Sequence, residues 1–369
     1  MNPIFMREAL DLARRGRGQA SPNPMVGALV VREEQIVGRG FHTYAGLQHA
    51  EIIALHEAGE LARGSTVYVN LEPCSHQGRT PPCVDALITA GVKRVVAPLD
   101  DPNPLVAGEG FRKLRAAGVE IELAPEFIGE ARKLNEPFFH FMRTGRPLVT
   151  LKTAITLDGK ISAPDDNRGW ITSERAREHV QQLRHEHDAI LTGIGTVLAD
   201  DCLLTDRTGL PRCRPLLRIV LDSQLRLPLE SKLARSTSGD VLVVTTSAAS
   251  AERRKLVEKQ GIEVHVMDGP GGRADLGGII NWLGAERYLS LMIEAGSKVN
   301  WTALESGCVD RIFFYYGPKI LGGLEALPLA GGIGRRRRAD AIRLHGITIH
   351  PIPPDEFAVE GYLDVYRDH

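Results

Sequence analysis

Residues 47–83 read LQHAEIIALHEAGELARGSTVYVNLEPCSHQGRTPPC, and the rest of the chain is organised around this stretch. His49, Cys74 and Cys83 supply one imidazole and two thiolates, a donor set that binds zinc tetrahedrally and leaves the fourth position open. Glu51 follows His49 by two residues, so its carboxylate can face the open position without ligating the metal and can carry protons there. The stretch therefore predicts a catalytic zinc site.

The sequence around these residues predicts elements that would bring them together. Residues 65–71 (STVYVNL) form a run of β-branched and aromatic residues typical of a buried strand, and Cys74 lies just beyond its end. His49 and Cys83 each begin an apolar run of helical type, so two helix N-termini would point at the metal and favour thiolates. The alternative is a structural zinc knuckle or a few buried cysteines, neither of which needs Glu51.

Several motifs of the first half resemble a known family. H-A-E at 49–51 with P-C at 73–74 is similar to the H-x-E and P-C-x-x-C signature of zinc deaminases, although eight residues separate the cysteines here. PCSHQGRTPPC at 73–83, SPNPMVG at 21–27 and QHAE at 48–51 resemble the bifunctional deaminase/reductase of riboflavin biosynthesis. The resemblance is dense over the first 110 residues and continues, less strictly, to about residue 300.

The resemblance implies two successive reactions. The family deaminates 2,5-diamino-6-ribosylamino-4(3H)-pyrimidinone 5′-phosphate at zinc, then reduces the ribosyl group of 5-amino-6-(5-phosphoribosylamino)uracil to ribityl with NADPH. We therefore expect one zinc ion per subunit, NADPH, and a pyrimidine ribosyl phosphate as the small-molecule substrate. In the deaminase site Glu51 would be catalytic, and the substrate contacts would be Asn23, His42, His76, Arg79 and Asn103.

Length and composition indicate a globular protein with two domains. The chain has 369 residues, of which 43% are hydrophobic and 25% charged, and it is too long for one ordinary core. A net charge of −1 argues against nucleic acid as a partner, and the lack of any long apolar run argues against a membrane. Five cysteines, an odd number, fit a reducing cytoplasm. We expect a cytoplasmic homo-oligomer, either a dimer or a tetramer.

The first half alternates between helical and strand patterns. A helical stripe over residues 4–15 precedes a β-hairpin, VGALVV with QIVGRGF, and helices and strands then alternate as far as VEIEL. This order predicts a three-layer α/β/α domain with a mixed sheet, and the resemblance implies that it is cytidine-deaminase-like. Residues 100–104 (DDPNP) follow the strand at 94–98, at the edge where open α/β sheets bind ligands. They resemble the family's segment that contacts the sugar and phosphate of the substrate.

A turn at residues 145–147 (GRP) is the expected domain junction. It would separate a zinc-dependent deaminase domain, residues 1–145, from an NADPH-dependent reductase domain, residues 146–369. Strand and helix patterns alternate again in the second half, but no G-x-G-x-x-G follows a strand, so a Rossmann site is not indicated. Residues 193–196 (GIGT) predict a glycine-rich turn suited to a phosphate.

Motifs of the second half resemble the reductase domain of the same family, which has a dihydrofolate-reductase-like α/β fold. They are LKTAITLDGKIS, WITS, LTGIGTVLADDCLLTDR and MIEAGSKVN. The resemblance implies NADPH contacts at Ala154, Trp170, Thr196, Asp200, Ser223, Gly296 and Ser297. It implies substrate contacts at Arg184, Leu204, Arg207 and Glu294, and we add Lys152 beside Glu294 as a candidate polar group at the reacting sugar. Arg168 and Cys202 depart from the family pattern, which has a small serine and a proline there.

Two rival functions explain only part of the sequence. A tRNA or nucleobase zinc deaminase with an unrelated C-terminal domain would normally show C-x-x-C and a basic surface. It would also leave roughly 220 residues unexplained. A non-catalytic zinc-stabilised binding module predicts that changing Glu51 leaves metal content and function intact. The basic run at 335–338 lacks the interleaved aromatic residues of a single-strand binding surface, so we interpret it as a solvated loop.

Overall fold

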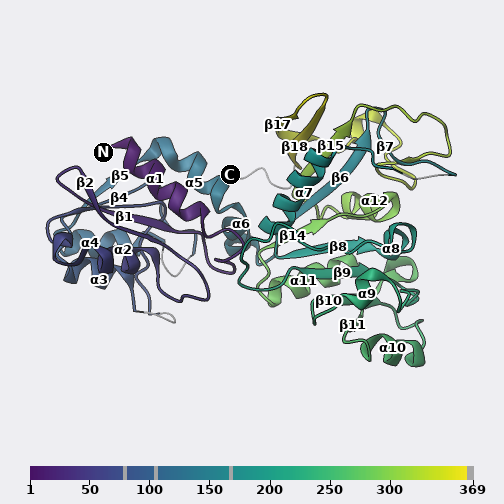
Figure 1. The fold of residues 1–369 in the computed structure, drawn as a ribbon, viewed down its shortest axis with the longest axis horizontal. Helices are drawn as coiled ribbons and strands as arrows, with labels where there is room; N and C mark the ends of the chain where they lie inside the picture. The colour runs from purple at the N-terminus through teal and green to yellow at the C-terminus, as the bar shows by residue number, and fades with distance from the viewer. Residues whose placement is uncertain (78–80, 104–106, 166–168, 364–369) are drawn as a thin grey trace. The chain divides into compact units, whose positions relative to one another are not determined.

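The structure is a computed structural model that describes residues 1–77, 81–103, 107–165 and 169–363, and it divides into two compact units (Figure 1). The N-terminal unit contains residues 1–145 together with 210–214, and the C-terminal unit contains the remainder. Nothing in the sequence indicated that residues 210–214 pack with the N-terminal unit. Within the described residues, no helix combines the length and the apolar character needed to cross a membrane.

The N-terminal unit is built on a five-stranded mixed sheet with the order β2-β1-β3-β4-β5. β1 pairs antiparallel with both of its neighbours, whereas β3, β4 and β5 run parallel, so the carboxyl ends of these three strands share one edge. The strands are β1 (Gly27–Arg32), β2 (Gln35–Phe41), β3 (Thr66–Val69), β4 (Arg94–Ala97) and β5 (Glu120–Leu123).

Helices cover both faces of this sheet, because successive side chains of a strand point to opposite faces. Leu29 and Val31 pack into one core, and Ala28 and Val30 pack into the other. The first core is closed by α1 (Pro3–Arg14), η2 (Pro125–Phe127) and α5 (Ile128–Leu134), and the second by α2 (Ala50–Ala58), η1 (Gly59–Ala62), α3 (Cys83–Thr89) and α4 (Glu109–Ala116). α6 (Glu136–Thr144) ends the unit. The predicted α/β/α layering is confirmed.

Two glycines of β2 allow α2 to approach the sheet closely. A Cβ on Gly40 would lie 2.1 Å from the carbonyl oxygen of Ala50, and a Cβ on Gly38 would lie 2.1 Å from that of Ala54. Side chains at these positions would therefore push the helix backbone away. Since His49 is the N-cap of α2, the depth of this helix also sets the position of the imidazole.

The C-terminal unit is built on a nine-stranded sheet with the order β11-β10-β9-β8-β14-β6-β15-β18-β17. The strands from β11 to β15 run parallel to their neighbours, and the β17–β18 hairpin is added antiparallel at one edge. In sheet order they are β11 (Glu263–Val266), β10 (Val241–Thr245), β9 (Leu217–Leu221), β8 (Ala189–Gly193), β14 (Ser290–Ile293), β6 (Leu148–Thr156), β15 (Arg311–Gly317), β18 (Glu356–Leu363) and β17 (Leu344–Ile352).

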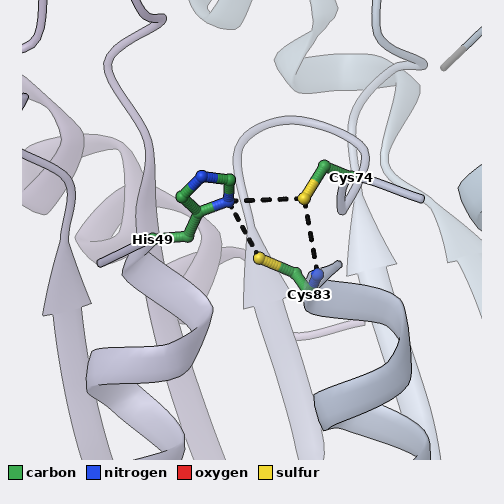
Figure 2. A group of neighbouring side chains, drawn as sticks. All are labelled: His49, Cys74 and Cys83. Atoms are coloured by element: carbon green, nitrogen blue, oxygen red, sulfur yellow. Dashed lines mark hydrogen bonds between the residues drawn. The ribbon is translucent and has the colours of Figure 1, made fainter. Parts of the chain in front are cut away.

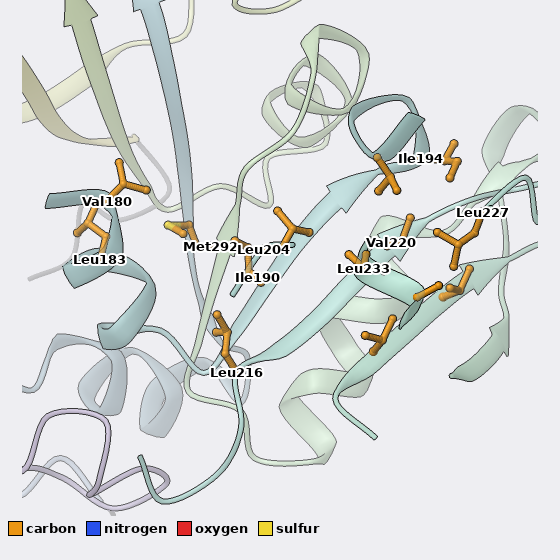
Figure 3. Packing of buried hydrophobic residues seen from close by; sticks show 14 of the residues in the cluster. Val180, Leu183, Ile190, Ile194, Leu204, Leu216, Val220, Leu227, Leu233 and Met292 are labelled. Atoms are coloured by element: carbon orange, nitrogen blue, oxygen red, sulfur yellow. The ribbon is translucent and has the colours of Figure 1, made fainter. Parts of the chain in front are cut away.

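Helices again cover both faces of the large sheet. On one face Val180 and Leu183 of the first helix, α7, belong to the same core as Ile190 of β8, Val220 of β9 and Met292 of β14 (Figure 3). The helices are α7 (Glu174–Glu186), α8 (Ile194–Asp200), α9 (Lys232–Arg235), α10 (Ala251–Glu258), α11 (Leu276–Ala285) and α12 (Ser297–Glu305). Short elements complete the unit: β7 (Lys160–Ser162) with β16 (Leu327–Pro328), β12 (Asp268–Gly269) with β13 (Arg273–Ala274), η3 (Pro270–Gly272) and η4 (Arg338–Asp340).

Most predicted elements of this unit are present, and one local prediction is wrong. The strand predicted at 148–156 is β6, and the helix predicted after Ser173 is α7, in whose first turn the amide of Ala176 donates to the Ser173 hydroxyl oxygen. Residues 193–196 were expected to form a glycine-rich turn. Instead Gly193 is the N-cap of α8, because Ile194 and Val197 of this helix are buried in the core.

We predict that Gly40→Ala destabilises the N-terminal unit by about 1–3 kcal/mol, the usual cost of overpacking, and also weakens zinc binding. The reason is that the added methyl group must displace the first turn of α2, next to His49. Chemical denaturation and metal analysis measure the two effects. The matched control is Gly129→Ala in α5, where a Cβ has no neighbour within 4 Å; equal losses in both variants would refute the account.

Candidate functional sites

Three side chains from separate segments of the N-terminal unit converge on one point (Figure 2). His49 is the N-cap of α2, Cys83 is the first residue of α3, and Cys74 lies in the loop after β3. The Nδ1 atom of His49 is 3.3 Å from Cys74 Sγ and 3.0 Å from Cys83 Sγ. The backbone amide of Cys83 also points at the Cys74 sulfur, at 3.4 Å.

This arrangement fits a zinc ion. The three potential ligand atoms all lie within 4.8 Å of one another. Tetrahedral zinc, with its usual bond lengths, places an imidazole nitrogen and a thiolate sulfur roughly 3.6 Å apart, so the imidazole and the two sulfurs need to separate by only about 0.3 to 0.6 Å. Two thiolates and one imidazole are ligands that zinc prefers, and three protein ligands leave a position for water or substrate.

The electrostatics of the cluster favour a thiolate and a proton-carrying carboxyl group. Hydrogen bonding from Cys83 lowers the pKa of the Cys74 thiol to about 4, against the effect of burial and with a further contribution from His49. Glu51 is buried in the first turn of α2. Burial, followed by the negative charge of Cys74, raises the pKa of Glu51. A carboxyl group with a raised pKa takes up and returns protons near neutral pH more readily than an ordinary one.

Two further predicted residues lie beside the metal donors. The amide nitrogen Nδ2 of Asn23 is 3.0 Å from His42 Nε2, and the other ring nitrogen of His42 is 2.9 Å from the carbonyl oxygen of Gln48. The rings of His42 and His49 meet edge to face, with centroids 5.4 Å apart. The structure therefore brings Asn23 and His42 to the candidate metal site.

The other predicted substrate contacts of this unit are less closely tied to the metal donors. His76 is exposed in the loop after Cys74. Asn103 is half-buried beyond β4, where its backbone amide donates to Asp101 Oδ1 at 2.8 Å. Arg79 lies outside the described residues, and its predicted role stays a prediction.

A second polar cluster is centred on Glu294, which follows β14 in the C-terminal unit. Lys152 Nζ of β6 donates to Glu294 Oε1 at 2.9 Å. The guanidinium group of Arg184, from α7, donates to Glu294 Oε2 from two nitrogens, at 3.0 and 3.2 Å, and to the carbonyl oxygen of Thr205 at 2.9 Å. The structure therefore brings together three residues that the sequence placed in the substrate site of the reductase.

The charge of this cluster is well defined. Burial by itself would raise the pKa of Glu294, but the charges of Lys152 and Arg184 and their hydrogen bonds lower it to about 2. Asp200, at the end of α8, feels the same carboxylate: burial, followed by the charge of Glu294, raises its pKa. At neutral pH the half-buried Glu294 is therefore an ionised carboxylate held between the two cations Lys152 and Arg184.

Two predicted contacts lie on the segment that follows α8. Leu204 is buried and has a positive φ of 55°, and Arg207 is exposed. The backbone amide of Arg207 donates to the side-chain oxygen of Gln181 on α7 at 3.0 Å. Because the carbonyl oxygen of Thr205 accepts from Arg184, this segment is attached to α7 on both sides of residue 206.

The residues predicted to bind cofactor phosphate meet at the start of α12. Gly296 is its N-cap, and a Cβ built there would lie 3.8 Å from the hydroxyl oxygen of Thr196 on α8. Ser297 is buried, and its hydroxyl oxygen has no hydrogen-bond partner among the described residues. A helix N-terminus with two hydroxyl groups suits the phosphate of a dinucleotide, so this place fits NADPH.

The remaining predicted cofactor contacts are dispersed. Ala154 lies on β6, half-buried against the core. Trp170 is exposed, and the Arg177 guanidinium lies 4.7 Å from its ring centroid. The hydroxyl oxygen of Ser223 accepts a hydrogen bond from the amide of Ala274 at 2.9 Å, so it already has a partner within the fold.

Sequence reasoning missed one aromatic residue at the second cluster. The ring of Tyr315, on β15, lies 5.7 Å from Lys152 Nζ, and its hydroxyl is 2.8 Å from Nδ1 of His179 on α7. Burial raises the pKa of this tyrosine. The strand RIFFYY reads as an apolar core strand, so no signal in the sequence distinguishes Tyr315 from its neighbours.

Both halves of the chain match known families. Residues 2–98 match the cytidine and deoxycytidylate deaminase zinc-binding region, and residues 147–353 match the RibD C-terminal domain. The riboflavin biosynthesis protein RibD of Escherichia coli (strain K12) is 41% identical and aligns over 95% of this chain and 96% of its own length. The RibD of Bacillus amyloliquefaciens is 39% identical over 96% of this chain and 95% of its own.

Solved structures give the same result. Acinetobacter baumannii RibD superposes with a TM-score of 0.86 at 35% identity, covering 98% of each chain. A diaminohydroxyphosphoribosylaminopyrimidine deaminase/5-amino-6-(5-phosphoribosylamino)uracil reductase from Thermotoga maritima superposes with a TM-score of 0.82 at 33% identity, again over 98% of each chain. The likeness therefore extends over both units of the fold.

We predict that the purified chain binds about one zinc ion, because three protein donors converge on a single site. Replacing both sulfur donors, in Cys74→Ser with Cys83→Ser, should abolish zinc binding as measured by metal analysis. Cys308→Ser, which changes a buried cysteine in the other unit, is the control and should retain the metal. Full zinc in the double variant would exclude this ligand set.

Proposed function

The chain belongs to the RibD family of riboflavin biosynthesis proteins, and on that basis we propose which residues carry out its two reactions. It is a bifunctional enzyme with a deaminase domain and a reductase domain, and its cofactors are zinc and NADPH. We assign residues 1–145 to the deaminase domain and 146–369 to the reductase domain. The two matched family regions, 2–98 and 147–353, support this division.

We assign to the deaminase domain the removal of the amino group of 2,5-diamino-6-ribosylamino-4(3H)-pyrimidinone 5′-phosphate. When bound by His49, Cys74 and Cys83, zinc lowers the pKa of a coordinated water and so supplies the nucleophile. Glu51 would accept the proton of the attacking water as its oxygen bonds to the amino-bearing ring carbon, and would return protons to the nitrogen as the carbon–nitrogen bond breaks and ammonia leaves. The single observation that carries this proposal is the buried Glu51 carboxyl group, with its raised pKa, beside three converging zinc donors.

The substrate of this site has to be oriented before the proton transfers. Asn23 and His42 would hold the pyrimidine ring, because they are hydrogen-bonded to each other beside His49. His76 would add a contact from the exposed loop after Cys74, and Asn103 would contact the sugar or phosphate. Arg79 is assigned to the phosphate by resemblance alone.

We assign to the reductase domain the conversion of the ribosyl group of 5-amino-6-(5-phosphoribosylamino)uracil to ribityl. NADPH, when bound, would supply the hydride for C1′ of the sugar; the bond from C1′ to the ring oxygen breaks, and that oxygen takes up a proton from water. Lys152 and Glu294 would orient the reacting end of the sugar, since Lys152 can donate a hydrogen bond while Glu294 stays ionised. Arg184 would hold Glu294 in place, and Leu204 and Arg207 would contact the rest of the substrate.

The proposed contacts with NADPH rest on the positions of residues around the start of α12 and on the family resemblance. Thr196, Gly296 and Ser297 would bind phosphate at the start of α12, and Ala154 of β6 and Asp200 of α8 would be further contacts of the cofactor. Trp170 and Ser223 stay proposed contacts on resemblance. We also propose a cytoplasmic location, because none of the five cysteines forms a disulfide, and a homo-oligomeric state, which sedimentation would test.

A zinc deaminase of nucleic acid with an unrelated C-terminal domain is not favoured. The RibD proteins of Bacillus amyloliquefaciens and Escherichia coli align with 96% and 95% of the chain, far more than the deaminase domain alone. Both units are thereby accounted for by one family.

We predict that Glu51→Gln retains zinc and the fold but loses deaminase activity by about 100-fold or more, the usual scale of general acid–base catalysis. The glutamine keeps the size of the side chain and removes its ability to carry a proton. Assays of ammonia release with the diaminopyrimidinone phosphate measure the loss.

The reductase serves as the internal control for this variant. Glu51→Gln should convert supplied deaminated intermediate at a rate close to that of the wild type, because the second site lies in the other domain. If both activities fell together, or if deamination persisted, the assignment of Glu51 would be wrong.

We predict that Arg207→Ala lowers the catalytic efficiency of the reductase by about 10- to 150-fold, because Arg207 would bind the substrate 5′-phosphate. The figure corresponds to roughly 1.5–3 kcal/mol for a hydrogen bond to a charged group. Arg207→Lys should be intermediate, since lysine keeps the charge but loses the two-pronged geometry. Steady-state kinetics of the reductase reaction measure the effect, and deamination should not change.

A substrate without the phosphate provides the control for Arg207. Wild type and Arg207→Ala should reduce this substrate at the same rate. Without a phosphate on the substrate, neither enzyme can form the contact between residue 207 and the phosphate. A variant that remained much slower on this substrate would show that Arg207 holds its segment in place.

A further inference from the structure

A buried carboxylate directly before the zinc-binding loop binds three backbone amides of a distant segment. Glu72 follows β3 and is only 3% exposed. Its Oε2 accepts hydrogen bonds from the amides of Asp101, at 3.0 Å, and Gly108, at 2.8 Å. Its Oε1 accepts from the amide of Phe111, at 3.0 Å, within the first turn of α4. One side chain thus binds the backbone at residue 101 and again at residues 108 and 111, and we call residues 101–103 and 108–111 the Glu72-bound segment.

Two independent contacts attach the same segment to the loop that carries Cys74. A Cβ built on Gly110 would lie 2.2 Å from the carbonyl oxygen of Pro73, so the backbones of α4 and the loop are in direct contact. The ammonium group of Lys113 donates to the carbonyl oxygen of Ser75 at 2.8 Å. The loop is therefore held against α4 both before and after the zinc ligand.

A glutamate such as Glu72 is energetically unfavourable at a buried position, where an apolar residue is usual. Burying a carboxylate is unfavourable unless several donors replace its water, and the three amides do so here. None of its hydrogen bonds within the described residues comes from a lysine or arginine, so the charge is balanced by backbone dipoles. An arrangement of this kind fixes the direction of three amides at once, which an apolar side chain cannot do.

The segment that Glu72 fixes carries a proposed substrate contact. Asn103 lies between the two amides that Oε2 binds, its own amide donates to Asp101 Oδ1, and its carbonyl oxygen accepts from the amide of Ala107 at 3.0 Å. The position of Asn103 relative to Cys74 is therefore set through Glu72. A shift of the segment would move the substrate contact while leaving the metal donors in place.

We infer that Glu72 is a positioning residue of the deaminase, which holds residues 101–103 and the start of α4 in fixed relation to the zinc ligands. The inference rests on the proposed deaminase function and on the assignment of Asn103 to the sugar or phosphate of the substrate. Glu72 touches neither the reacting carbon nor the metal donors in this account, so it acts on substrate binding.

The test is Glu72→Gln in the full-length zinc-loaded enzyme. Glutamine keeps the volume, but its NH2 group cannot accept a hydrogen bond, so at least one of the three amides loses its partner. We expect KM for the diaminopyrimidinone phosphate to rise about 10-fold, the effect of losing one hydrogen bond to a charged group, while kcat stays close to that of the wild type. Zinc content and reductase activity should not change.

The matched control is Glu109→Gln. Glu109 lies in the first turn of the same helix, but its carboxylate pairs with Arg112 at the surface and binds none of the three amides. The Glu109→Gln substitution removes one negative charge near the N-terminus of α4, as Glu72→Gln does. Its KM should equal that of the wild type, which separates the hydrogen bonds of Glu72 from a general effect of charge on α4.

A double-variant cycle tests whether Glu72 acts through the segment. In an Asn103→Ala background, Glu72→Gln should raise KM much less than it does alone, because the contact being positioned is already absent. Full additivity would overturn the inference. A lower melting temperature with unchanged KM would show a purely structural role, and loss of zinc would show that Glu72 supports the metal site instead. If the wild type itself failed to deaminate the substrate, the proposed function would fail, and this outcome is distinct from the others.

Discussion

The convergence of His49, Cys74 and Cys83 is the constraint on which the N-terminal unit depends. Each donor sits at the beginning of a helix or just beyond a strand, so the sheet and both helices must be in place before the three atoms meet. The glycines of β2 set the depth of α2, and the contacts of α4 set the loop around Cys74. The distances among the three metal donors therefore depend on how the helices and loops of the whole unit pack.

The C-terminal unit depends on a largely buried ion-pair cluster centred on Glu294. Glu294 is held between the cations of Lys152 and Arg184, which come from β6 and α7, so the cluster forms only when the helix packs on the sheet. The pKa of Glu294 is lowered to about 2 by these partners. Its carboxylate therefore stays charged over the whole physiological pH range and can orient a substrate hydroxyl without exchanging protons.

The sequence predicted most of what depends on local patterns. Alternating strand and helix patterns gave both α/β domains, and the spacing of His49, Glu51 and the cysteines gave the zinc donors, which the structure brings together. It could not reveal contacts between distant segments. Glu72 stands in an apolar run before a proline, and nothing in that run indicates that its partners lie beyond β4. The turn predicted at 193–196 was wrong because the buried Ile194, and not the glycines, determines that α8 begins there.

The presence of both activities in one polypeptide is tested most directly by identifying the product that the wild-type enzyme forms from the diaminopyrimidinone phosphate. Mass analysis without NADPH, in water enriched in heavy oxygen, should show replacement of the ring amino group by a labelled oxygen and no further change. Addition of NADPH should then add hydrogen to the ribosyl group of that product. A chain that released no ammonia, or that reduced the sugar only in a product already deaminated by another protein, would contradict the claim that this one polypeptide carries both sites.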